Sequence, residues 1–250
     1  LDPILMLDHF NSENPDDYIQ GFPPHPHRGF ETLTYMQQGS MEHKDSSGGH
    51  GIITSGGVQW MRAGSGVIHS EMPQQEKGRL SGFQFWLNLP NVQRMSDPFY
   101  QDVPPEQVPD IKVNDDIRLT LIAGEYQGYK SPVVRPDIEL LLLDINITNV
   151  ATFKLPTANG LRQFIYIHGG DVEVNGQTVS EGHIAVIQST DDIELMSANG
   201  RFIFGQGRAI GEKFVQHGPF VMSTHEELEQ AIQDYQMGTL VKKSTKDTAA

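Results

Sequence analysis

The sequence contains no cysteine among its 250 residues, so it can form no disulfide bond and can offer no thiolate to a metal ion. This composition fits a reducing compartment, and we expect a cytoplasmic protein. Runs of about 18 or more apolar residues are also lacking, as is a basic segment followed by an apolar one. Neither a membrane span nor a secretory signal is therefore predicted, although the sequence leaves open whether residues precede Leu1.

Basic residues are scarce. The chain has 18 Lys and Arg against 32 Asp and Glu, which gives a formal net charge of −14. Such a charge repels a phosphate backbone, and no cluster of basic residues offsets it locally. We therefore expect no direct binding to nucleic acid.

The composition predicts a mostly β protein. With 25 Gly and 15 Pro, it suits many short strands and tight turns better than long helices. The length allows one large domain or two of ordinary size. A polar, proline-containing stretch at residues 91–110 is interpreted as a linker, which divides the chain into domains at residues 1–108 and 109–250.

Two short histidine motifs carry the chemistry. Side chains two apart on a strand share a face, so His25 points the same way as His27, and His69 the same way as Glu71. If the two pairs lie on neighbouring strands of a small barrel, three imidazoles and one carboxylate surround one interior point. First-row divalent metals of intermediate hardness prefer these ligands. Pro26 also favours an extended chain at the first pair, and we predict a mononuclear metal site.

A single His-x-His motif is a weak signal, because a polar strand face can carry two histidines without binding a metal. The second pair, preceded by the flexible Gly64-Ser65-Gly66 bend, makes the prediction much stronger.

Three further residues have open interpretations. His43 either lines the substrate cavity or lies at a solvated strand position, and Gln84 faces either the cavity or solvent. Glu31 has the same parity as the first histidine pair. It is either a reserve candidate for the carboxylate ligand, or a hydrogen-bond partner that orients a ligand imidazole without binding the metal itself.

Three motifs resemble the pirin family of the cupin superfamily. They are PHPHRGFET at residues 24–32, VQWMRAGSGVIHSEM at 58–72 and GPFVM at 218–222. The resemblance implies two tandem cupin barrels of the double-stranded β-helix or jelly-roll type, with a mononuclear iron in the first. Many cupins take their carboxylate from a position like that of Glu31. The pirin pattern instead implies the ligands His25, His27, His69 and Glu71.

The resemblance also implies an activity, that of a flavonol (quercetin) 2,3-dioxygenase. A metal-chelating hydroxy-carbonyl substrate would react with O2, and Glu71 would accept the hydroxyl proton. The alternative is a redox-sensitive, metal-dependent regulatory protein that contacts a transcriptional or metabolic partner. A third reading is an isomerase or small-molecule binder, since one fold hosts many chemistries. The implied metal is Fe(II), and sequence alone does not separate it from Mn, Ni, Co, Cu or Zn.

The second half predicts another barrel without a metal site. Neither His-x-His nor His-x-Glu occurs in it, and we interpret the isolated His168 and His183 as structural. One short α-helix is expected over residues 224–238, because Thr224 with Glu227 forms a capping box and Gly238 suits the end of a helix.

Overall fold

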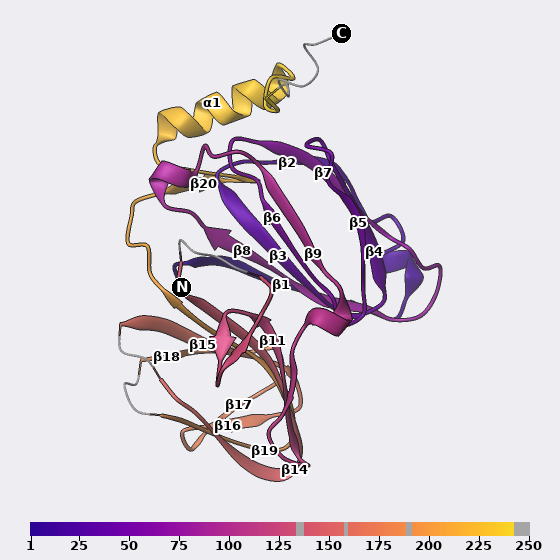
Figure 1. Cartoon of the computed structure of the whole chain (residues 1–250), viewed down its shortest axis with the longest axis vertical. Helices are drawn as coiled ribbons and strands as arrows, with labels where there is room; N and C mark the ends of the chain where they lie inside the picture. Colours follow the sequence, from indigo (N-terminus) through magenta and orange to yellow (C-terminus); the bar gives the residue numbers. More distant parts are fainter. Residues whose placement is uncertain (134–137, 158–159, 189–191, 243–250) are drawn as a thin grey trace. The chain divides into compact units, whose positions relative to one another are not determined.

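The computed structural model describes residues 1–133, 138–157, 160–188 and 192–242, and these residues are mostly in β-strands, as predicted (Figure 1). They form two compact units. The first, here called the first barrel, contains residues 3–105 and the C-terminal segment from Ile210 onward. The second barrel contains residues 106–209 together with Leu1 and Asp2.

The first barrel is built from two antiparallel sheets that face each other (Figure 1). Phe30, Leu33, Phe83 and Phe85 are fully buried in it, which accounts for much of its hydrophobic stabilisation. The five-stranded sheet contains, in spatial order, β1 (Ile4–Ser12), β8 (Leu80–Asn88), β3 (Phe30–Gln38), β6 (Val58–Arg62) and β9 (Phe99–Val103). The four-stranded sheet contains β2 (Phe22–His27), β7 (Val67–Pro73), β4 (Ser40–Asp45) and β5 (His50–Thr54). Two 3-10 helices, η1 (Pro15–Asp17) and η2 (Asn91–Gln93), lie in its loops.

Strand β9 lies inside the stretch that the sequence predicts to be a linker, so that prediction is wrong for residues 99–103. The strand pairs with β6 in the register Val58 to Val103, and the ring of Phe99 lies 5.0 Å from that of Trp60. Prolines and polar residues on both sides of β9 make the whole stretch resemble a linker, although Phe99, Tyr100 and Val103 themselves favour a strand. The pairing with β6 shows that this short segment belongs to the sheet.

The second barrel is a single antiparallel sheet dominated by two 16-residue strands, β14 (Leu140–Leu155) and β19 (Ile193–Arg208), which pair along most of their length. Its core includes Leu119, Leu143, Ile165 and Phe202, all fully buried. The other strands are β10 (Asp110–Lys112), β11 (Ile117–Ala123), β15 (Leu161–Gly169), β16 (Val172–Val174), β17 (Gln177–Val179) and β18 (Ile184–Ile187). A small hairpin joins β12 (Glu125–Tyr126) to β13 (Tyr129–Lys130), and η3 (Pro105–Gln107) precedes the unit's first strand.

The C-terminal segment forms a hairpin, β20 (Val215–His217) with β21 (Phe220–Met222), and the helix α1 (His225–Gln236). The helix begins as predicted: the Thr224 hydroxyl accepts a hydrogen bond from the Glu227 amide at 3.2 Å, and Glu227 in turn accepts one from the Ser223 amide. Its assignment to the second domain differs from the structure, however, because the segment from Ile210 onward groups with the first barrel.

Within the first barrel, the Arg28 side chain connects the strands of residues 3–105 with the C-terminal segment. Its guanidinium is nearly fully buried and donates to Asp234 of α1 at 2.7 Å, to the Ser65 carbonyl at 2.8 Å and to the Leu240 carbonyl at 3.1 Å. A buried guanidinium needs such acceptors, since an uncompensated charge in the interior is costly. Residues more than 200 positions apart are thereby joined, which local sequence patterns do not reveal.

Strand β21 lies directly beside the end of β2. The Val221 amide donates to the Arg28 carbonyl at 3.0 Å, and Gly29 follows with a φ of +87°. A Cβ atom at Gly29 would overlap the Val221 carbonyl oxygen, so only glycine fits this turn. The GPFVM motif thus supports the strand that carries the first histidine pair.

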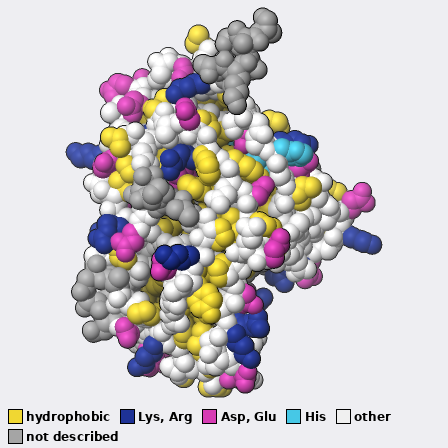
Figure 2. Space-filling view, in the orientation of Figure 1, with side chains coloured by type: hydrophobic (Ala, Val, Ile, Leu, Met, Phe, Trp, Pro, Cys, Tyr) yellow, Lys and Arg dark blue, Asp and Glu magenta, His cyan; other side chains and the backbone are white. Residues whose placement is uncertain are grey.

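Charged side chains of both signs are interspersed over the face drawn in Figure 2. None of the helices in the described ranges has the length and apolar character needed to cross a membrane.

Replacing Asp234 with Asn should lower the free energy of unfolding by about 1–2 kcal/mol, because the buried Arg28 guanidinium loses its charged acceptor. Urea denaturation measures this change. Glu229→Gln removes a charge from an exposed position of the same helix and should leave the unfolding midpoint unchanged. Equal effects of the two substitutions would show that the Arg28–Asp234 pair contributes no specific stability.

Candidate metal centre

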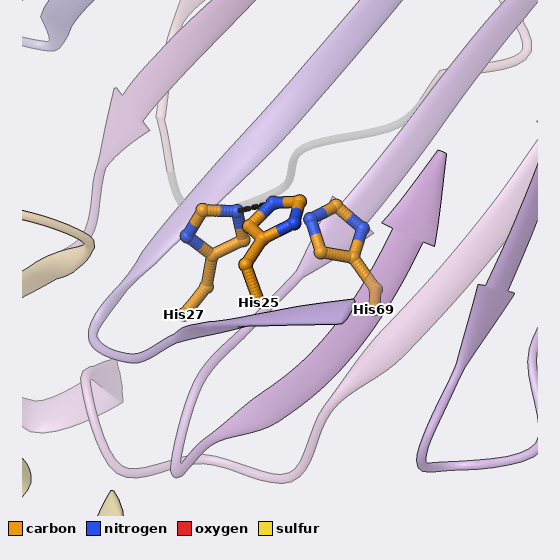
Figure 3. A group of neighbouring side chains, drawn as sticks. All are labelled: His25, His27 and His69. Atoms are coloured by element: carbon orange, nitrogen blue, oxygen red, sulfur yellow. Dashed lines mark hydrogen bonds between the residues drawn. The ribbon is translucent and has the colours of Figure 1, made fainter. Parts of the chain in front are cut away.

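Three histidines from two neighbouring strands meet inside the first barrel (Figure 3). His25 and His27 come from β2 and His69 from β7, and the antiparallel register places His25 opposite His69. The ring centroid of His69 lies 4.3 Å from that of His25 and 4.7 Å from that of His27. Pro26 is tolerated between the first two because β2 is the edge strand of its sheet.

The nitrogen atoms are arranged as ligands of one ion would be. The Nε2 atoms of His25 and His27 lie 3.1 Å apart. Two nitrogens bound to one metal at about 2.1 Å and at right angles would be separated by about 3 Å. His25 Nδ1 lies 2.8 Å from the Pro23 carbonyl, which can only accept, so this nitrogen carries the hydrogen and Nε2 presents its lone pair.

His69 provides the strongest indication that this site can bind a metal ion. The residue is 1% exposed, yet its Nε2 has no hydrogen-bond partner among the described residues. In Figure 3 one of its ring nitrogens points toward His25 and the other points away. Because buried polar atoms in native proteins are nearly always bonded, an unbonded imidazole nitrogen beside two others fits a metal ligand.

The buried imidazoles are held neutral. Burial, with a further contribution from neighbouring His25, lowers the pKa of His27 to about 3. Burial and the adjacent His27 and His25 likewise lower the pKa of His69 well below its ordinary value. A neutral imidazole has a lone pair to donate, so these two side chains need lose no proton before they bind a cation near neutral pH.

Glu71 lies near His69, in a second group of potential ligands that also contains His43. Among the residues that the structure describes, two groups of three potential ligands lie within 4.8 Å of one another, and they share His69. The first contains His25 and His27, and the second contains His43 and Glu71. The structure therefore brings the three predicted imidazoles together, and it places the predicted carboxylate with His69 and His43 instead of in the group that contains His25 and His27.

Gln84 holds the Glu71 carboxylate. Its amide nitrogen lies 3.1 Å from each carboxylate oxygen, and Trp86 donates to its amide oxygen at 3.3 Å. Burial raises the pKa of Glu71, against the opposing effect of the Gln84 hydrogen bond and of His43. The Gln84 side chain therefore faces the cavity, which is one of the two alternatives that the sequence leaves open.

His43 is also inside, with 1% of its side chain exposed, so it does not lie at a solvated strand position. It stands opposite Glu71 in the pairing of β4 with β7. Sequence reasoning passed over its neighbour Asp45, whose side chain is equally buried and contacts His43. The period of two that revealed the other pairs applies to His43-x-Asp45 as well.

Glu31 is in neither of the two groups of potential metal ligands that the described residues form. It accepts a 2.7 Å hydrogen bond from Arg62, which faces it across the pairing of β3 with β6. Gly29 turns the chain between β2 and β3, so Glu31 belongs to the other sheet. The alternation of side chains along a strand therefore does not continue from His25 through this turn to Glu31.

A small cavity lies beside Glu71 in the first barrel. Its lining combines aromatic, apolar and polar side chains, namely those of Asp8, Phe10, Phe22, Thr34, Met41 and Gln84. Glu71 and Gln84 therefore face the same small space.

Known proteins match the chain over most of its length. The family model described as Pirin matches residues 1–87, and the one described as Pirin C-terminal cupin domain matches residues 142–241. A Pseudomonas aeruginosa protein named "Putative quercetin 2,3-dioxygenase" is 40% identical over 96% of this chain and 87% of its own length. The chain belongs to the pirin family. Human pirin is 37% identical over 94% of the chain and 81% of its own length.

Solved structures agree with this membership. The crystal structure of a quercetin 2,3-dioxygenase from Acinetobacter baumannii superposes with a TM-score of 0.89. It is 33% identical and covers 96% of this chain and 86% of its own. The prediction of a pirin with two tandem cupin barrels is confirmed.

The purified pirin should bind one divalent ion per chain, as elemental analysis of protein prepared without chelator would measure. His69→Gln should weaken binding by at least about 100-fold, more than the loss of an outer partner usually costs. His183→Gln is the matched control, because His183 is exposed in the second barrel and should leave the metal content unchanged. Equal metal content in the two variants would contradict the assignment of this site.

Proposed function

We propose that this pirin is a mononuclear non-haem iron protein that acts as a flavonol 2,3-dioxygenase. His25, His27, His69 and Glu71 would hold the iron. The observation that carries the proposal is the convergence of three imidazoles, two of them buried, with a buried carboxylate within 4.8 Å of a His69 ring nitrogen. The names of the Pseudomonas and Acinetobacter relatives supply the reaction class.

A ferrous ion held by imidazole and carboxylate would supply a Lewis acid with open coordination positions for a hydroxy-carbonyl substrate and O2. The protein's own contribution is to position the groups and exclude water. His27, His69 and Glu71 are each less than 5% exposed, so the reacting end of a substrate would be shielded from solvent. Phe10 and Phe22 line the small cavity beside Glu71, where their rings could pack against a flat aromatic substrate.

Glu71 would accept the proton of the substrate hydroxyl group. It is a buried carboxylate beside the proposed iron ligand His69, where it could reach a hydroxyl group of a bound substrate. The Gln84 amide contacts both carboxylate oxygens and so fixes the plane of the carboxylate. Gln84 therefore acts as a positioning residue for the base.

The test is single-turnover chemistry on iron-loaded protein. Quercetin is added without oxygen, 18O2 is then admitted, and mass spectrometry should find both labelled oxygen atoms in the products. Glu71→Gln, compared at equal iron occupancy, should slow the reaction by about 10²–10⁴-fold, the usual contribution of a general base. Glu76→Gln changes an exposed carboxylate in the loop after β7 and should have no effect.

Unchanged quercetin in fully iron-loaded protein would contradict the dioxygenase proposal. The regulatory alternative would then be preferred, in which the same ion reports redox state to a protein partner.

A further inference from the structure

A line of buried polar contacts leads away from the candidate metal centre on the far side of His69. His69 Nδ1 lies 3.3 Å from His43 Nδ1, and His43 Nε2 lies 3.3 Å from Asp45 Oδ2. The side chains of His43 and Asp45 are each 1% exposed, so no bulk water competes for these contacts. In the pairing of β4 with β7, Asp45 stands opposite His69.

Only one arrangement of hydrogens satisfies these contacts with neutral rings. An ionised carboxylate accepts and cannot donate, so His43 must carry its hydrogen on Nε2. Its Nδ1 then has a lone pair, which accepts from His69 Nδ1. His69 is thereby left with an unprotonated Nε2, a buried atom for which the described part of the chain provides no hydrogen-bond partner.

Asp45 is held as an ionised acceptor by its own turn. Its Oδ1 accepts from the Ser47 amide at 2.7 Å, the Ser47 hydroxyl at 2.6 Å and the Gly49 amide at 2.9 Å. Burial alone would raise the pKa of Asp45, but the hydrogen bonds from His43, Ser47 and Gly49 outweigh it and lower the pKa to about 2. Oδ2 remains directed to His43.

The His43 ring is fixed from one face by Tyr100, which stacks on it with centroids 4.7 Å apart and planes 26° apart. The Tyr100 hydroxyl donates to Asp102 at 2.7 Å and accepts from Gln59 at 2.8 Å. A ring held in this way can reorient less freely, which favours a single tautomer.

We propose that Asp45 and His43 form a positioning relay that selects the tautomer of His69 and keeps its Nε2 available to the metal. Metal-bound histidines commonly donate their other ring hydrogen to such a partner, and here the partner is a second imidazole backed by a carboxylate. The relay rests on the proposed metal centre but not on the identity of the substrate.

The direct test is to observe the tautomers in the metal-free full-length protein. Nitrogen-15 NMR of the histidine rings near neutral pH should find His69 protonated on Nδ1 and His43 protonated on Nε2. The reverse assignment at either ring would overturn the proposal. This measurement needs no variant, so misfolding cannot obscure it.

Asp45→Asn tests whether the Asp45 carboxylate sets the tautomers of His43 and His69. Its amide oxygen can still serve the Ser46–Gly49 turn, but its amide nitrogen is a donor and should drive the His43 hydrogen to Nδ1. Zinc affinity, measured by competition with a chelating dye, should then fall by about 10–100-fold. The matched control is Glu42→Gln, which alters the carboxylate–histidine contact of Glu42 with exposed His50 on the adjacent strand and should not change zinc affinity.

Unchanged tautomers and zinc affinity in folded Asp45→Asn would show that Asp45 sets neither, which overturns the relay. Both experiments use zinc or no metal, and neither uses flavonol or O2. A failure to oxidise quercetin would therefore overturn only the dioxygenase proposal.

Discussion

The antiparallel pairing of β2 with β7 is the constraint on which the candidate site depends. It sets His25 opposite His69 and so brings three imidazoles together. Because β7 also pairs with β4 on its other edge, the same strand carries His69 opposite Asp45 and Glu71 opposite His43. A slip of one residue in either pairing would turn a set of side chains to the opposite face. One central strand therefore fixes both the candidate ligands and the residues behind them.

An edge strand rich in proline is a weak support for such a site, because Pro23, Pro24 and Pro26 donate no backbone hydrogen bonds. The first barrel compensates from outside the sheet. The chain immediately after β2 bonds to β21 through its backbone and to α1 through the Arg28 side chain. This explains why a C-terminal motif belongs to the same pattern as the histidine motifs: it supports the strand that carries two of the candidate ligands.

Sequence reasoning worked where the evidence is local and periodic. A period of two suffices to place His25 with His27 and His69 with Glu71, and a capping box suffices to start α1. It failed where a residue's environment is set by distant chain. Nothing near Glu31 reveals that Arg62 will face it from another strand, and nothing near Asp234 reveals Arg28. The sequence determines which face a side chain occupies within one strand, but parity does not carry across a glycine turn into another sheet.

The interior of the first barrel contains more polar side chains than a stable core requires. Each buried imidazole or carboxylate costs free energy unless its polar atoms are bonded. Around Asp45, His43 and Glu71 the structure provides these bonds, with backbone amides, another ring and the Gln84 amide as partners. Among the described residues, His69 Nε2 is one of several buried polar atoms without a hydrogen-bond partner, and it lies beside two other imidazoles. A network that satisfies its outer members and leaves the inner nitrogen open is organised toward an external ligand, because stability alone would favour a fully bonded or apolar core.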